Sequence, residues 1–330
     1  MIDMKDLILP EAGYAEIMKT KVEPYLVRRG TAGYCEREAG NRIFYTRYLA
    51  GQPRGIVVIS HGFTETVEKY KENIYYFLKA GYHVYMPEHC GHGRSYRMKG
   101  MTEELSLVHI DHYRRYVEDL LFVSRIAAQE FLELPVYLYG HSMGGGIAAA
   151  AAAQAPELFQ KVVLSSPMIR PLCGSIPWPA ASLAVKLLCI AGKKDKYVII
   201  HHPYEGKERF EDSASASRAR FDYYQEKRRK EPLFQMCAAS YGWFREAVRL
   251  NRYLQKKAWK HISCPVLMFQ AEQETLVSKK EQERLIRKMY RRGKRDAKLI
   301  KVPGAKHEIF NADKELLEVY WRRVFGFLRR

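Results

Sequence analysis

A glycine-rich turn at residues 140–146 constrains this chain more than any other segment. Its core, Gly140-His141-Ser142-Met143-Gly144, follows a strand-like apolar run at 136–139 and precedes an Ala-rich helical run at 147–154. A sharp strand-to-helix turn forces its central residue into strained backbone angles, so the residues two positions away must be small. Gly140 and Gly144 meet this requirement. The turn therefore predicts that Ser142 is presented as a nucleophile.

Short apolar runs alternate with helical patterns on both sides of this turn. The helical spacing is clearest at 69–79 and 112–130. This alternation is typical of a mostly parallel sheet flanked by helices. The predicted buried strands lie at 55–60, 83–86, 136–139, 162–164, 266–270 and 299–302.

The alternation is interrupted between about residue 168 and residue 260. This stretch contains no clear buried strand and is rich in charged residues, Tyr and Ser. We therefore predict one core built from residues 1–167 and 259–330, with residues 168–258 inserted as a helical cap or lid. A chain of 330 residues is long enough to bury a core of this size.

A serine nucleophile needs N–H donors for the oxyanion that it creates. One donor is expected to be the backbone N–H of Met143, which directly follows the nucleophile. The second should come from the loop after an early buried strand. The run at 55–60 leads into His61-Gly62-Phe63, so we assign this donor to the Phe63 N–H.

The general base is expected after the last strand of such a sheet. His307 lies between the strand-like run at 298–302 and a terminal helix. His141 is beside the nucleophile, but its side chain should point away on a sharp turn. Structural roles are favoured for the histidines of the loops and helix starts, at positions 89, 92, 109 and 112, over a metal site.

The acid of the triad must lie between the serine and the histidine in chain order. No Asp follows the strand-like run at 266–270, but Glu272 and Glu274 do. A carboxylate in this position orients the histidine and stabilises its protonated form, and the longer Glu side chain can do the same. Glu274 is preferred, with Glu272 as the alternative.

Together these motifs resemble the lysophospholipase and monoacylglycerol lipase branch of the α/β-hydrolases, which also carries the serine-aminopeptidase-like label. The similarity extends over nearly the whole chain. Its motifs are His61-Gly62-Phe63, Gly91-His92-Gly93-Arg94-Ser95, the turn at 140–145 and Gly304-Ala305-Lys306-His307-Glu308. Segments 218–224 and 239–247 are similar to the cap of bacterial inner-membrane lysophospholipases.

The resemblance also bears on the triad acid. The family motif G-x-x-D-x-x-V aligns with residues 271–277 and places its acid on Glu274. Two departures affect the site entrance: Ala271 replaces the usual Gly, and Glu88-His89-Cys90 stands where the family often has Asp-x-Arg.

The resemblance implies an α/β-hydrolase fold and a serine hydrolase acting on lipid-like carboxylic esters, a lysophospholipid or a monoacylglycerol. The alternative is an esterase or aminopeptidase-like hydrolase acting on a small non-lipid ester or amide. A non-catalytic scaffold is disfavoured because nucleophile, base and oxyanion loop are all present. The apolar run at 176–191 is the candidate acyl pocket, and the predicted substrate-binding residues are His61, Trp178, Leu183 and Leu187.

The net charge of +18 favours either solvated helix faces or contact with an anionic membrane. The basic runs are not interleaved with aromatic residues in a nucleic-acid module, so no nucleic-acid partner is expected. The six cysteines form no ligand-like cluster, and neither a metal nor a cofactor is expected. The N-terminus lacks a secretory pattern and no window spans a membrane. A cytoplasmic location is expected, with peripheral contact at the inner face of the membrane as a further option.

Overall fold

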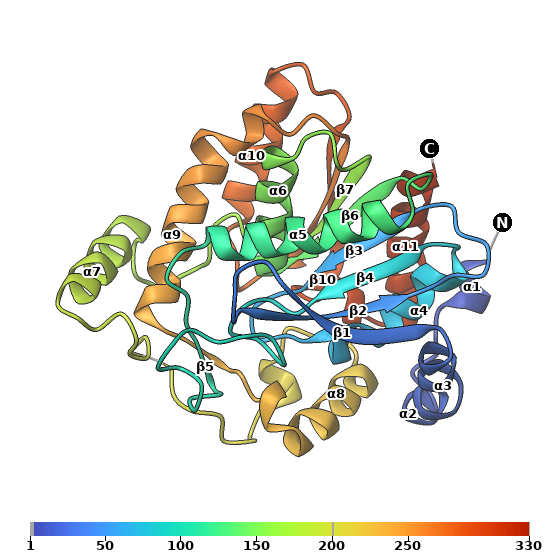
Figure 1. Ribbon diagram of the computed structural model, residues 1–330, viewed down its shortest axis with the longest axis horizontal. Coiled ribbons are helices and arrows are strands. Elements are labelled where there is room, and N and C mark those ends of the chain that lie inside the picture. The colour runs from blue at the N-terminus through green and yellow to red at the C-terminus, as the bar shows by residue number, and fades with distance from the viewer. Residues whose placement is uncertain (1–2, 200, 330) are drawn as a thin grey trace.

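A central sheet of eight strands organises the computed structural model, which describes residues 3–199 and 201–329 (Figure 1). The strand order is β1-β2-β4-β3-β6-β7-β9-β10. β1 and β2 pair antiparallel, β2 pairs antiparallel with β4, and all later neighbours are parallel. The strands are β1 (Gly30–Glu36), β2 (Arg42–Tyr48), β3 (Ile56–Ser60), β4 (His83–Pro87), β6 (Val136–His141), β7 (Lys161–Ser165), β9 (Val266–Gln273) and β10 (Ala297–Lys306).

Helices cover both faces of the sheet (Figure 1). The longer ones are α4 (Lys71–Lys79), α5 (Arg114–Glu130), α6 (Ser142–Gln154), α7 (Trp178–Ile190), α8 (Arg218–Lys230), α9 (Tyr241–Lys256), α10 (Lys279–Arg291) and α11 (Lys314–Arg329). The N-terminal helices are α1 (Met4–Leu7), α2 (Tyr14–Ile17) and α3 (Glu23–Val27), with the π-helix η1 (Met18–Val22) between the last two. Short 3-10 helices are η2 (Val67–Tyr70), η3 (Phe210–Asp212), η4 (Pro232–Phe234), η5 (Ala258–Lys260) and η6 (Ile309–Asn311).

Strand β3 shows why helices must pack against both faces of the sheet. Ile56 and Val58 belong to the apolar cluster that contains α5, α6, α9 and α10, whereas Val57 and Ile59 belong to the cluster on the other face. Successive side chains of a strand point to opposite faces, so an unbroken apolar run requires helices on both sides. The mostly parallel sheet flanked by helices that the sequence predicts is confirmed.

All six predicted strands are present, but the two antiparallel strands at one end of the sheet, β1 and β2, are not predicted. β1 is only partly buried along its length, because it forms one edge of the sheet. Its sequence, GTAGYCE, has no apolar run for a pattern to detect.

Residues 168–258 contribute α7, α8 and α9, together with β8 (Ala238–Ala239), which pairs with β5 (Leu107–Val108). In Figure 1, α7 projects at the left, on the side away from both chain termini, and α8 lies below the sheet. Ala247, Leu250 and Leu254 of α9 belong to the same apolar cluster as α6. The inserted segment is thus anchored through α9. Among residues 3–199 and 201–329, no helix combines the length and the apolar character needed to cross a bilayer.

Candidate active site

Ser142 lies at the junction of β6 and α6, where the chain turns sharply from strand to helix. Its φ angle is 51°, a left-handed conformation that non-glycine residues rarely adopt. A Cβ atom on Gly144 would lie 2.1 Å from the Ser60 carbonyl oxygen, and one on Gly140 would lie 2.7 Å from the Gly144 carbonyl oxygen. The two glycines therefore allow the close packing that holds Ser142 in its strained conformation.

His307 and Glu274 reach Ser142 from loops that follow β10 and β9. The His307 Nε2 lies 2.8 Å from the Ser142 Oγ, and the His307 Nδ1 lies 2.7 Å from the Glu274 Oε2. All three side chains are at least nine-tenths buried. The structure thus joins the three predicted residues into one hydrogen-bonded chain.

Backbone donors hold the Glu274 carboxylate in place. Its Oε1 accepts the N–H groups of Leu276 and Val277, at 2.9 and 3.1 Å. Burial raises the pKa of Glu274, but the hydrogen bonds from His307 and from these two N–H groups outweigh burial and lower it below its usual value. Glu274 is therefore ionised at neutral pH.

The alternative acid, Glu272, lies elsewhere. Its side chain is exposed, and its Oε2 accepts the Gly304 N–H at 2.9 Å. Only Glu274, of the two, makes a hydrogen bond to His307. The geometry therefore agrees with the preference for Glu274.

Two backbone N–H groups are candidates for the oxyanion site. Phe63 follows β3 in the loop that lines the cavity at Ser142, and its N–H makes no hydrogen bond within the described chain. Met143 is the second residue of α6, where N–H groups have no carbonyl partner within the helix. The Gly62 N–H is already engaged, since it donates to the Glu65 Oε2 at 2.6 Å. The Phe63 N–H thus remains free among the described residues, whereas that of Gly62 does not.

Buried histidines hold the loop at residues 61–63 through hydrogen bonds to the backbone. The His61 Nε2 accepts the His89 N–H at 2.8 Å, and the His61 Nδ1 lies 2.8 Å from the Gly62 carbonyl oxygen. Burial lowers the pKa of His61 to about 4, so its ring is neutral at pH 7. His61 is fully buried and does not line the cavity. Its predicted role in substrate binding is therefore wrong, because both ring nitrogens bond to the backbone.

His141 faces away from the nucleophile, as expected on such a turn. Its Nδ1 lies 3.1 Å from the Ser165 carbonyl oxygen, and its ring packs against that of His307 with the centroids 4.9 Å apart. Burial lowers the pKa of His141 to about 4. His141 thus packs against the His307 ring, while its own Nδ1 is directed to the backbone.

The sequence did not reveal an ion network beside the triad. Lys69 pairs with Glu308, the neighbour of His307, and lies 3.0 Å from the Glu65 carboxylate. Burial opposes ionisation of Glu65, but Lys69 and His141 lower its pKa to about 2. The network ties the oxyanion loop to the loop of His307. Only Glu308, inside the His307 motif, carried any sequence signal.

A cavity of about 600 Å³ opens above Ser142. Phe63 and Trp243 form part of its wall, with their ring centroids 4.3 Å apart. Most of the other contributors are apolar residues from the inserted segment, including Met168, Leu172, Ile176, Val185, Leu188 and Phe244. The site is therefore a small-molecule pocket with an apolar wall and few polar groups.

Three predicted substrate-binding residues of α7 do not line this cavity. Leu183 and Leu187 are each 57% exposed on the outer side of the helix, and Trp178 packs against Phe244 with the ring centroids 5.8 Å apart. Helix α7 is apolar on almost every side, so composition cannot show which side faces inward. The inward side carries Ala181, Ala184, Val185 and Leu188, which share one helical face.

Among the described residues, no group of three or more His, Cys, Asp or Glu side chains is arranged to hold a metal ion. The histidines at positions 61, 89 and 92 lie close together. Both ring nitrogens of His61 and one each of His89 and His92 face backbone groups or the Ser60 hydroxyl, whereas the buried His92 Nε2 has no hydrogen-bond partner among the described residues. The chemistry available at the site is that of a nucleophilic serine, an imidazole base, a carboxylate and two N–H donors.

Comparisons with known proteins also indicate a hydrolase. The family model described as "Serine aminopeptidase, S33" matches residues 51–315. The monoacylglycerol lipase of Mycolicibacterium smegmatis is 27% identical over 84% of this chain and 90% of that protein. The probable lysophospholipase L2 of Haemophilus influenzae is 28% identical over 73% of this chain and 80% of that protein.

Solved structures share the fold. A soluble variant of the Saccharomyces cerevisiae monoglyceride lipase superposes with a TM-score of 0.71 at 20% identity, over 91% of this chain and 94% of that one. A carboxyl esterase from Bacillus coagulans gives a TM-score of 0.73 at 19% identity, over 91% and 98% of the two chains. The matched family model covers most of the chain, including Ser142, Glu274 and His307. The chain therefore belongs to the serine aminopeptidase S33 family of α/β-hydrolases, in the branch of the monoacylglycerol lipases and lysophospholipases.

Proposed function

We propose that this protein is a serine hydrolase that cleaves the carboxylic ester of a lysophospholipid or a monoacylglycerol through an acyl-enzyme on Ser142. The observation that carries the proposal is the hydrogen-bonded chain of Ser142, His307 and Glu274 at the base of an apolar cavity of about 600 Å³. The names of the two curated relatives, a monoacylglycerol lipase and a probable lysophospholipase, support the same substrate class.

Acylation begins when the Ser142 Oγ attacks the ester carbonyl carbon and its proton passes to the His307 Nε2, 2.8 Å away. Glu274 holds the imidazole by its Nδ1 and stabilises the imidazolium that forms. The Phe63 and Met143 N–H groups bind the oxyanion of the tetrahedral intermediate. Loss of one such donor typically raises the barrier by about 3 kcal/mol.

The intermediate collapses when His307 returns its proton to the departing alcohol oxygen, which leaves the acyl group on Ser142. Water then attacks the acyl carbonyl carbon, with His307 as its base, and releases the fatty acid. The leaving alcohol must therefore lie on the His307 side of the scissile bond.

The lining of the cavity favours a fatty acyl chain over a peptide amine. An aminopeptidase needs carboxylates that hold the substrate's ammonium, and the sequence candidates are Glu205, Glu208, Glu211 and Asp212. None of these four lines the cavity at Ser142. Burying a methylene group in an apolar wall contributes about 0.8 kcal/mol, so longer acyl chains gain affinity here.

Residues 168–258 are proposed to act as the cap over this site, since residues from α7, α9 and the intervening segment line the cavity. We further propose that the cap contacts an anionic lipid surface. Its outer side exposes Leu183, Leu187 and Ile190, and Lys186 and Lys193 lie exposed beside them. Apolar side chains flanked by cations are typical of contact with a membrane interface.

The test is a substrate panel measured with the wild-type protein and with Ser142→Ala. We expect the wild type to hydrolyse monoacylglycerols and lysophospholipids, with kcat/KM rising with acyl length and exceeding that for aminoacyl amides. Ser142→Ala should lose at least about 10³-fold in kcat and all labelling by a fluorophosphonate probe. Equal rates for the two proteins, or no labelling of the wild type, would overturn the proposal and favour a non-catalytic role.

A further inference from the structure

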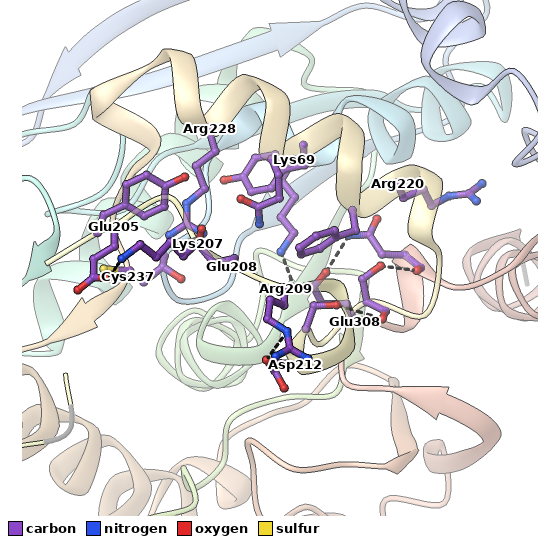
Figure 2. Close-up of a pocket in the computed structure, with 18 of the residues that line it drawn as sticks. Lys69, Glu205, Lys207, Glu208, Arg209, Asp212, Arg220, Arg228, Cys237 and Glu308 are labelled. Atoms are coloured by element: carbon purple, nitrogen blue, oxygen red, sulfur yellow. Dashed lines mark hydrogen bonds and ion pairs between the residues drawn. The ribbon is translucent and has the colours of Figure 1, made fainter. Parts of the chain in front are cut away.

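A second cavity, of about 510 Å³, adjoins the catalytic one. Figure 2 shows the residues that line it. It lies beneath α8 and is bounded by residues of the segment 202–215. Thr64, Lys69, Cys237 and Glu308 line both cavities, so the two are neighbours along one shared wall. Its size is within the roughly 300–1,000 Å³ of small-molecule sites.

The second cavity lies on the side of the site where the leaving alcohol emerges. His307 protonates the alcohol oxygen, and Glu308, the next residue, forms part of the shared wall. Thr64 follows the oxyanion donor Phe63 and lies on the same wall. With the acyl chain in the apolar cavity, the second cavity offers the alcohol part of the ester a space that shares a wall with the first.

The cations that line this cavity differ in whether they are already paired with groups of the protein. Arg220 is buried, pairs with Glu72 and accordingly points away from the other labelled side chains (Figure 2). Arg228 is bonded to Glu208 and to two backbone carbonyl groups. Both guanidinium groups are thus committed to the fold.

Lys207 and Arg209 are the cations that remain available. Their side chains are 80% and 69% exposed. Among the described residues, the one ion pair of Lys207 is with Glu205. The Arg209 Nε lies 3.6 Å or more from its carboxylate partners, Glu211 and Asp212. Side chains with such loose pairing can turn to a phosphate, which a guanidinium and an ammonium bind through charge-assisted hydrogen bonds.

Gln225 supplies an independent sign of a ligand. Its side chain lines the second cavity and is only 6% exposed, yet its Oε1 has no hydrogen-bond partner in the described part of the chain. A buried polar atom without a partner is costly and rare, and calls for an explanation. The oxygen is covered in the present conformation, so a ligand that brings a hydroxyl or ammonium donor would satisfy it once the amide turns toward the cavity.

We infer that the second cavity binds the zwitterionic phosphodiester head group of a lysophospholipid substrate, an inference that rests on the proposed function. Lys207 and Arg209 contact the phosphate, and Gln225 accepts a hydrogen bond from the donor end of the head group. The enzyme thereby prefers lysophosphatidylethanolamine over a monoacylglycerol with the same acyl chain, because glycerol alone leaves the phosphate contacts unmade.

The test compares these two substrates, both with one short acyl chain and both below their micelle-forming concentrations. In the double variant Lys207→Gln/Arg209→Gln, we expect kcat/KM for lysophosphatidylethanolamine to fall about tenfold, mainly through KM. The value for the monoacylglycerol should stay within about twofold. The control, Lys280→Gln/Arg287→Gln, removes two exposed cations from α10 and should change neither value.

Gln225→Met tests the buried amide separately. The thermal midpoint of unfolding of this variant should equal that of the wild type, because the amide oxygen has no partner in the described part of the chain. Its preference for lysophosphatidylethanolamine over the monoacylglycerol should decrease. Glycerophosphoethanolamine should inhibit hydrolysis of a soluble short-chain ester more strongly than inorganic phosphate does. Equal inhibition by both compounds would show a simple phosphate site and overturn the head-group assignment.

The remaining outcomes separate this inference from the proposed function. A wild type that hydrolyses both substrates with equal kcat/KM, or a double variant that loses both activities alike, would overturn the head-group site alone. A wild type that hydrolyses neither lipid would overturn the proposed function itself.

Discussion

The Glu274 Oε2 lies 2.7 Å from the His307 Nδ1, and the other oxygen of the same carboxylate accepts two backbone N–H groups. The carboxylate is therefore held at both oxygens, and its pKa is below the usual value. This arrangement assigns the proton of the neutral imidazole to Nδ1, since a carboxylate is an acceptor. The Nε2 is then left as an acceptor facing the Ser142 hydroxyl.

Replacement of Glu274 by Gln should lower kcat by about 10² to 10⁴-fold, because the amide can donate to Nδ1 and favour the wrong tautomer. Ester hydrolysis at saturating substrate measures the effect. Glu272→Gln is the matched control: Glu272 is exposed and bonds to the Gly304 N–H, so its loss should change kcat less than about twofold. The reverse ranking of the two variants would assign the acid role to Glu272.

Gly144→Ala should prevent stable folding or lower the free energy of unfolding by more than about 3 kcal/mol. The added Cβ would lie 2.1 Å from the Ser60 carbonyl oxygen, and neither backbone can shift without moving β3 or Ser142. Gly326→Ala in α11 is the control, because nothing lies within 4 Å of its added Cβ. It should stabilise the protein by about 0.5–1 kcal/mol, since Ala favours a helix over Gly. Urea unfolding would measure the free energy of unfolding of both variants. A Gly144→Ala variant as stable as the wild type would contradict the close contact at this turn.

Stability should decrease as the pH falls from 7 to 5, because burial lowers the pKa of His141 from 6.5 to about 4. Below pH 6.5 the unfolded chain binds a proton that the folded chain does not, so protonation favours unfolding. The loss from His141 amounts to about 2 kcal/mol at pH 5. The free energy of unfolding, measured with urea at pH 7 and at pH 5 for the wild type and for His141→Gln, gives the contribution of His141 to the pH dependence. An equal pH dependence in the two proteins would mean that His141 takes up its proton in the folded state as readily as in the unfolded chain.

Leu183→Ser/Leu187→Ser should weaken activity at a lipid surface without affecting catalysis in solution. Both leucines are 57% exposed and lie outside the catalytic cavity, so their loss removes apolar area only from the outer side of α7. With anionic vesicles that contain a monoacylglycerol, we expect the rate to fall about fivefold or more, which corresponds to about 1 kcal/mol of lost interfacial burial. Hydrolysis of a water-soluble short-chain ester should be unchanged. A loss with both substrates would indicate damage to the cap, and a loss with neither would argue against contact through α7.

Local sequence patterns determined the parts of the site that depend on the backbone of a short segment. The turn around Ser142 needs two small residues at fixed positions, and this steric demand is visible in five consecutive letters. The buried strands appear as unbroken apolar runs because a parallel sheet is covered on both faces. The chain order of strand, loop and histidine likewise pointed to His307.

The tertiary structure decided what depends on contacts between distant segments. Trp178, Leu183 and Leu187 are as apolar as Val185 and Leu188, and only the packing of α7 on α9 shows which of them face the cavity. The distance from Glu274 to His307 follows from how two loops meet across neighbouring strands. The pairing of Lys69 with Glu308 joins residues 239 positions apart. The spacing of apolar residues shows whether a segment is buried on one side or on both. It does not show which distant segment packs against it, because that depends on how the whole chain folds.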